Sequence, residues 1–289
     1  GAPRIRVIGI GGAGGNILDG LDKSRMNGVE FIGINTDAQA LGKCSLATKL
    51  LIGGKQTRGL GTAGEVEIAR AALEEDRDKV AALVEDVDLL ILLAGLGGGT
   101  GTAVTAALAE LAAGGDCLVL AFVTMPFSFE GQGRRRVAEA YLGELRRQVH
   151  GIIALPNDVL LQECEETASA VEAFSLANDW IELGFASICS MLLGTGLVNQ
   201  DFGSLRAIFR NFGGKTLFGI GAASGEHRVE GALQQLFLCP LLRLGDRPGT
   251  FDKVLVHITG GPDLGLGTVN TILSKIREHF KLGEDLVLG

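Results

Sequence analysis

Two glycine-rich segments stand directly behind apolar runs in this chain of 289 residues. The first, GGAGGN (11–16), follows RIRVIGI, and the second, GLGGGTGT (95–102), follows DLLILLA. Glycine lets backbone amides approach a ligand closely, and the start of a helix adds a positive partial charge to those amides. A phosphate group is the natural ligand of such a turn. One such turn is also explained by tight packing of a strand against a helix, but two of them after different strands favour a shared anion site.

The first segment taken alone also fits a dinucleotide-binding motif. Gly9, Gly11 and Gly14 satisfy the spacing G-x-G-x-x-G, and Glu30 or Asp37 falls near the position of a ribose-binding acid. A dinucleotide-dependent dehydrogenase, however, gives no reason for the second and richer segment. A P-loop does not fit either. Counted back from the lysine of GGKT (213–216), the first glycine of that motif would fall at position 209, which is occupied by Phe209.

Apolar runs alternate with amphipathic stretches and predict the elements that carry the two turns. Buried strands are expected over 4–10, 29–37, 87–95, 117–127 and 151–158, with helical patterns between them. Between 134 and 149, for example, an apolar residue recurs every fourth position and forms one helix face. This alternation predicts an α/β fold with a parallel, doubly wound sheet. Because parallel strands end at one edge of a sheet, both glycine turns are expected at that edge.

Three parts are predicted along the chain. Residues 1–164 form the sheet domain, residues 165–198 contain a long proline-free helix with its connection, and residues 199–289 form a smaller α/β domain. In the last part, strands are expected over 215–224 and 253–261, and helices over 228–237 and 268–280. The long helix is expected to act as a central spine.

Composition limits the partners and the compartment. A net charge of −8 makes nucleic acid or an acidic membrane surface an unexpected partner, because both bind clustered positive charge. The five cysteines and four histidines are scattered, so we expect free thiols and no metal site built from protein ligands. The longest apolar runs fall far short of the ~20 residues of a membrane helix, and no secretory leader is expected before the first strand. We therefore expect a cytoplasmic protein without direct membrane contact.

The segment GGGTGT behind a strand resembles the signature of the tubulin/FtsZ family, and the resemblance extends along most of the chain. It implies a GTP-binding, self-assembling protein with a GTPase domain, a long central helix and a smaller C-terminal domain, whose filaments form the bacterial division ring. The expected partner is a second copy of the chain, joined head to tail. The matching segments are GGAGGN (11–16), NTDAQAL (35–41), GLGTAGEVEIAR (59–70), GLGGGTGT (95–102), PFSFEG (126–131), LPND (155–158), FSLAND (174–179) and NQDFGSL (199–205).

The resemblance implies that backbone amides of both turns hold the phosphates of GTP or GDP. Glu130 and Arg134 would contact the ribose and a phosphate. Mg²⁺ would be held by phosphate oxygens and water instead of protein ligands. The implied phosphate-binding positions are Gly12, Ala13, Gly14, Gly15, Gly98, Gly99, Thr100, Gly101 and Thr102.

The resemblance also assigns a set of residues to the guanine base. Phe174 would stack on the ring, and Asp179 would accept hydrogen bonds from the ring N–H and the exocyclic amine. Asn16 would complete base recognition, and Asn178 belongs to the same GTP-binding set. Adenine does not present that pair of donors, so these residues would select guanine.

A loop after the long helix would complete the active site of the neighbouring subunit. The usual form of this loop in the family is N-x-D-x-x-D; here Asn199 and Asp201 remain, while Ser204 replaces the second acid. Serine can hold a water molecule but cannot supply the negative charge that polarises it, and loss of a positioned base typically costs ~10² to 10⁴ in rate. Slow hydrolysis is one hypothesis, and ordinary hydrolysis supported by Asp201 or another acid is a second. A non-hydrolysing filament scaffold, or an accessory partner of a conventional family member, is a third.

Overall fold

The computed structural model describes residues 3–21, 23, 26–46, 48–160, 168–193, 202–209, 216–243, 254–282 and 286–288. The chain divides into two compact units, one made of residues 1–186 with 209–216 and the other of residues 187–208 with 217–289. The three-part division at 164 and 198 stays a prediction.

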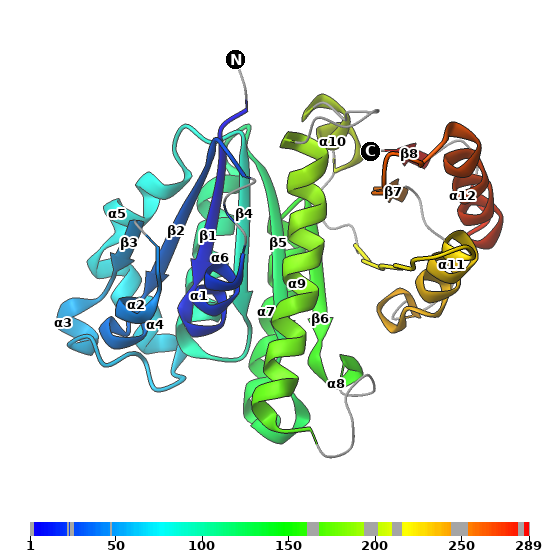
Figure 1. The fold of residues 1–289 in the computed structure, drawn as a ribbon. Helices are drawn as coiled ribbons and strands as arrows, with labels where there is room; N and C mark the ends of the chain where they lie inside the picture. The colour runs from blue at the N-terminus through cyan, green and yellow to red at the C-terminus, as the bar shows by residue number, and fades with distance from the viewer. Residues whose placement is uncertain are drawn as a thin grey trace. The chain divides into compact units, whose positions relative to one another are not determined.

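A sheet of six parallel strands forms the centre of the first unit (Figure 1), in the order β3-β2-β1-β4-β5-β6. The two central strands, β1 and β4, are almost wholly buried, as expected of a parallel sheet covered on both faces. The predicted doubly wound α/β fold is therefore confirmed. The strands are β1 (Ile5–Ile10), β2 (Val29–Asn35), β3 (Thr48–Leu51), β4 (Leu89–Gly95), β5 (Leu118–Met125) and β6 (Gly151–Pro156).

Helices cover both faces of this sheet. Figure 1 shows α1 and α9 in front of it, and on the other face α6 packs between α4 and α7 over a core of aliphatic side chains. Asp76 separates α4 from α5, while α2, α3 and β3 were not predicted. The helices are α1 (Gly11–Gly20), α2 (Ala38–Lys43), α3 (Gly54–Thr57), α4 (Val66–Glu75), α5 (Arg77–Ala81), α6 (Gly99–Ala113), α7 (Gln132–Gln148), α8 (Asn157–Leu160) and α9 (Ala170–Leu193), with 3₁₀ turns at Ala82–Val84 and Ser128–Glu130.

The helix α9 corresponds to the predicted spine. Its residue Phe185 is fully buried and makes edge-to-face contacts with Phe31 and Phe122 of the sheet, with ring centroids 6.5 Å apart in both pairs. These contacts fix the first part of α9 against the sheet and hence the residues near its start. The helix continues through residues 186 and 187, where the chain passes from one unit to the other.

The second unit has a small core around Leu233, Val256, Ile276 and Phe280. The predicted helices over 228–237 and 268–280 and the strand within 253–261 are confirmed. The strand predicted over 215–224 is wrong for the described residues 216–224, where no strand forms; the ladder partner of β7 comes instead from β8. The elements are α10 (Phe202–Ile208), α11 (Arg228–Leu238), a 3₁₀ turn (Pro240–Arg243), β7 (Val254–Val256), α12 (Leu266–His279) and β8 (Leu286–Leu288).

Candidate functional site

The two glycine turns lie side by side at the carboxyl edge of the sheet. The first follows β1 and opens α1, the second follows β4 and opens α6, and β1 and β4 are paired neighbours. The strand order changes direction between these two strands, which is the point where doubly wound sheets bind their ligands. The expectation of a shared edge is therefore confirmed.

Backbone geometry explains why glycine is needed in both turns. Gly11 has φ of +68° and Gly97 has φ of +99°, a region that favours glycine. A side chain at Gly14 would collide with the carbonyl oxygen of Leu93 in β4, so α1 can lie this close to the sheet only with glycine there. The turns thus bring two helix starts together at the end of the sheet.

Neither helix start is closed by its own side chains. Both α1 and α6 lack a side-chain cap and have no acidic residue in the first turn. The first amides of a helix have no partner inside it, and they carry a positive partial charge. Two uncapped starts that face one space form a site for an anion.

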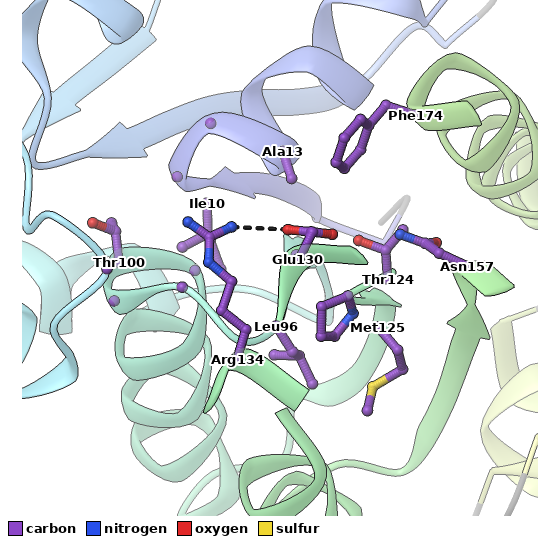
Figure 2. A pocket seen from close by; sticks show the side chains of 18 of the residues that line it. Ile10, Ala13, Leu96, Thr100, Thr124, Met125, Glu130, Arg134, Asn157 and Phe174 are labelled. Carbon is purple, nitrogen blue, oxygen red and sulfur yellow. Dashed lines mark hydrogen bonds and ion pairs between the residues drawn. The ribbon is translucent and has the colours of Figure 1, made fainter. Parts of the chain in front are cut away.

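A cavity of about 370 Å³ opens between the two turns. Figure 2 shows it from close by, with Phe174 pointing toward it from α9 and the side chains of Glu130 and Arg134 beside one another. Its walls include Thr62 and Gly64 from the loop before α4. The predicted GTP-binding residues that line it are Gly12, Ala13, Gly98, Gly99, Thr100, Gly101, Glu130, Arg134, Phe174 and Asn178.

Glu130 and Arg134 form an ion pair at the wall of this cavity. One carboxylate oxygen of Glu130 accepts a hydrogen bond from the backbone N–H of Phe127 at 2.9 Å, and the other contacts the Arg134 guanidinium at 2.8 Å. The Glu130 side chain is 14% exposed and that of Arg134 is 52% exposed. Glu130 is therefore fixed, whereas Arg134 is free to turn toward a ligand in the cavity.

An aromatic cluster stands at the α9 side of the cavity. Phe174 meets Phe127 edge to face at 4.9 Å, and Phe127 stacks on Phe129 with ring planes 10° apart. Phe127 is fully buried, while Phe174 remains 41% exposed. A half-exposed ring held in place by a buried neighbour is suited to stacking on a flat ligand.

Some of the predicted residues lie elsewhere. Asn16 and Gly15, together with Gly12, line a second cavity of about 280 Å³ between α1 and α2. Gly14 and Thr102 are buried beneath the turns, where the Thr102 hydroxyl accepts a hydrogen bond from the Gly97 N–H at 2.9 Å. Asp179, next to Asn178 on α9, is exposed and lines neither of these cavities.

The predicted catalytic loop is only partly within the described residues. Asn199 and Asp201 lie outside them. Ser204 belongs to α10, but its side chain is also outside the described part of the structure. The roles given to these three residues stay predictions.

The second cavity carries a buried thiol, Cys44, beside Gly15. Burial, with the neighbouring Asp19 carboxylate adding to it, raises the pKa of this thiol above its ordinary value. Asp19 is held in turn by the backbone N–H and the hydroxyl of Ser45, at 2.8 and 2.9 Å. Cys44, Cys117 and Cys239 are buried and form no disulfide, as expected for the described cysteines.

Sequence reasoning missed several polar residues of the larger cavity, above all Asn157. Asn157 follows β6 and is only 2% exposed, and among the described residues its side-chain oxygen has no hydrogen-bond partner. An orphaned acceptor at a cavity wall invites a donor from a ligand. Its position in LPND, directly after a parallel strand, was the available signal. Other missed lining residues are Asn35, Thr62 and Thr124.

The described residues contain no group of three or more His, Cys, Asp or Glu that could hold a metal ion. Within the same residues, none of the helices is both long and apolar enough to cross a bilayer.

Comparison with family models and curated proteins gives matches along nearly the whole chain. Residues 4–165 match the Tubulin/FtsZ family GTPase domain, and residues 214–289 match the FtsZ family C-terminal domain. The chain is 38% identical over 285 residues to the cell division protein FtsZ of Buchnera aphidicola subsp. Schizaphis graminum, covering 99% of this chain and 74% of that protein. It is 35% identical to the FtsZ of Wigglesworthia glossinidia brevipalpis over the same length.

Solved structures agree with these matches. An empty FtsZ dimer of M. jannaschii superposes with a TM-score of 0.89 at 29% identity, covering 100% of this chain and 83% of that one. CetZ2 from Haloferax volcanii, in a GTPγS-bound protofilament, has a TM-score of 0.78 at 21% identity, covering 99% of this chain and 88% of that one. The latter likeness concerns the fold alone.

Proposed function

The chain belongs to the Tubulin/FtsZ family, as its resemblance implied, and on this premise we propose that it binds GTP in the larger cavity and assembles head to tail into filaments for cell division. One observation carries the binding proposal: two uncapped helix starts open into one cavity that also holds a guanidinium and a half-exposed aromatic ring. Guanine nucleotides combine a phosphate chain, a ribose and a flat base. The cavity offers a partner for each of these.

In this proposal the amides of both turns hold the phosphates, and Arg134 leaves Glu130 to contact one of them. Glu130, fixed by the Phe127 N–H, accepts a hydrogen bond from the ribose. Phe174 stacks on the base. Asn157 offers its unpaired side-chain oxygen to a donor on the nucleotide. Asn16, which lines the second cavity, and Asp179, which is exposed on α9, are proposed to contact the base.

Magnesium is proposed to accompany the nucleotide through phosphate oxygens and water. Glu130 accepts the Phe127 N–H and is assigned to the ribose, and the Asp37 carboxylate caps α2 by accepting the Ala40 N–H at 2.9 Å. The neutral oxygens of Thr62 and Thr100 line the cavity and are suited to bonding water in the shell of the ion. When bound, the ion would neutralise charge on the phosphates.

Filament assembly is proposed to be head to tail and to take place in the cytoplasm. The loop with Asn199 and Asp201 lies near residue 200, whereas the cavity is built from residues 10–178. A contact that brings the loop of one copy to the cavity of the next uses two different surfaces. Such a heterologous contact propagates instead of closing a dimer.

Hydrolysis is proposed to be slow because Ser204 replaces the second acid of that loop. Water attacks a phosphate more readily when a carboxylate accepts its proton, and the serine hydroxyl cannot take that part at neutral pH. Asp201 remains as the single acid of the loop.

The test is steady-state phosphate release from purified protein with GTP and Mg²⁺, together with sedimentation in GTP, in GDP and without nucleotide. We expect GTP-dependent pelleting and slow release that rises at least tenfold in Ser204→Asp. Ser224→Asp is the matched control, because it adds the same charge at an exposed residue outside the loop. It should change neither phosphate release nor sedimentation.

Ordinary release that Ser204→Asp does not alter would contradict slow hydrolysis. Pelleting with GTP but without any phosphate release would instead favour a non-hydrolysing scaffold. Absence of GTP binding by calorimetry would contradict the proposal as a whole.

A further inference from the structure

A buried pair of threonine hydroxyls joins the ends of two strands that are not neighbours. Thr36 follows β2, Thr100 is the second residue of α6 after β4, and their Oγ1 atoms are 2.7 Å apart. Thr36 is 0% exposed and Thr100 is 8% exposed. Because β1 lies between β2 and β4, this hydrogen bond connects the two sides of the first glycine turn.

The backbone of Thr36 holds a third segment at the same point. Its carbonyl oxygen accepts hydrogen bonds from the Thr57 hydroxyl at 3.1 Å and from the Gly61 N–H at 3.2 Å. Gly61 leads directly into the loop at Thr62 that lines the larger cavity. Thr36 therefore ties the β2 end, the second glycine turn and this loop together, although it lines neither described cavity itself.

Counting hydrogens gives the direction of the bond when an anion is bound. Each hydroxyl has one hydrogen to donate, and of this pair only Thr100 lines the cavity. A phosphate oxygen can only accept, so a Thr100 hydroxyl that contacts the phosphate in the proposed complex donates its hydrogen to it. The hydrogen between the two threonines must then come from Thr36.

We infer that Thr36 is a positioning residue of the phosphate site, whose hydroxyl orients the hydroxyl of Thr100 as a donor to the bound nucleotide. The inference rests on the proposed GTP-binding function and adds a residue behind the cavity wall to it. It applies to nucleotides with a phosphate chain and not to guanosine, because the oriented hydrogen faces the phosphates.

The test measures binding of GTP, GDP and guanosine by calorimetry to the wild type, Thr36→Val and Thr36→Ser. Valine keeps the shape of threonine but removes the hydroxyl, and serine keeps the hydroxyl. We expect Thr36→Val to weaken GTP and GDP binding about five- to tenfold, Thr36→Ser to stay within about twofold, and guanosine binding to be unchanged in both.

A double-mutant cycle separates positioning from simple loss of stability. Thr100→Val should weaken GTP binding at least as much as Thr36→Val does, and adding Thr36→Val to it should cost nothing further, because the hydroxyl that Thr36 orients is already gone. Thr271→Val removes a hydroxyl from the exposed face of α12 and serves as the control, with GTP binding as in the wild type.

Additive losses in the double variant, an equal loss for guanosine, or wild-type GTP affinity in Thr36→Val would each overturn the inference. If Thr36→Val does not fold, Thr36→Ala is judged by the same three criteria. A wild-type protein that binds no GTP would overturn the proposed function first, so the two failures are distinct.

Discussion

In the first glycine turn the closest neighbour of Gly14 is the sheet, whereas in the second turn the closest neighbour of Gly99 is another loop. A side chain at Gly14 would meet the Leu93 carbonyl oxygen of β4, and one at Gly9 would meet the Gly14 carbonyl oxygen at 2.5 Å. A side chain at Gly99 would instead meet the Thr62 hydroxyl, and the Glu65 carbonyl oxygen at 2.6 Å. The first turn is thus part of the rigid sheet.

At Gly99 the second turn is packed on the 62–65 loop, which has more freedom to move than a strand, whereas at Gly101 it meets the Gly95 carbonyl oxygen of β4. Loops have fewer buried partners than strands and change shape at lower cost. The comparison teaches that one half of the anion site is a fixed floor, while the other half can respond to what the cavity holds.

Gly14→Ala is expected to have the largest effect. Its methyl group would press on backbone of β4 that cannot shift, so we expect a loss of at least about 3 kcal/mol in the free energy of unfolding, measured by urea denaturation.

Gly12→Ala is the matched control in the same turn. No atom lies within 4 Å of its side-chain position, so stability should change by less than about 0.5 kcal/mol while GTP binding weakens. Equal stability of the two variants would contradict the rigid-floor description.

Gly99→Ala tests the second turn and should cost less, about 1 to 3 kcal/mol, because the 62–65 loop can move away. Adding Thr62→Ala removes one of the two obstructing groups and should restore part of the lost stability. A loss as large as that of Gly14→Ala, with no rescue, would show that this loop is as rigid as the sheet.

Arg134→Gln removes the one guanidinium that the described residues place at the cavity wall, and it should weaken GTP binding about tenfold while leaving guanosine binding unchanged. Arg135→Gln is the control on the same helix, since Arg135 pairs with Glu139 at 3.0 Å and does not line the cavity. Calorimetry at two salt concentrations measures GTP and guanosine binding by both variants. Equal losses in both variants would mean that general charge, and not the position of Arg134, attracts the nucleotide.

Substitution of Asp76 is expected to have the smallest effect on stability. The Asp76 carboxylate bonds to Gly53, in the segment of the chain that precedes the 62–65 loop. The hydrogen bond from Lys79, followed by one from the Gly53 N–H, holds the pKa of the Asp76 carboxyl below its usual value, against an opposing effect of burial. A carboxyl with a lowered folded pKa stabilises the protein above its unfolded pKa of ~3.9, and that stabilisation is lost as the pH falls through the folded pKa.

Thermal unfolding of Asp76→Asn and wild type at several pH values measures this contribution. The variant should be less stable at pH 7, and the difference should shrink below about pH 4. A difference that does not depend on pH would contradict the assignment. Asp78→Asn, two residues further along the chain in the first turn of α5, is the control.

The sequence predicted most of the elements around the anion site for a simple physical reason. Central parallel strands are buried on both faces, so β1, β4 and β5 appear as nearly continuous apolar runs, and glycine turns mark the ends of β1 and β4. The short elements α2, α3 and β3 lie at the edge of the sheet, where four to six residues leave no clear periodicity.

The predicted site residues divide in a similar way. Those on the two turns could be placed because they directly follow strand ends, whereas Glu130 and Arg134 were assigned from the family resemblance. Asn157 also follows a strand directly, but its lack of a hydrogen-bond partner depends on the folded structure, and Thr36 bonds to a residue 64 positions later. Burial of a lone Asn or Thr leaves no periodic signal.

All six strands of the sheet run in one direction, which gives the first unit a practical asymmetry for protein engineering. The ligand-facing turns sit at one edge, while the turn at 114–116, exposed and located before β5, sits at the opposite edge. A fluorescent reporter or affinity tag inserted there would extend from the sheet edge opposite the cavity. Such a fusion would make the protein visible and leave the cavity edge of the sheet free of the insertion.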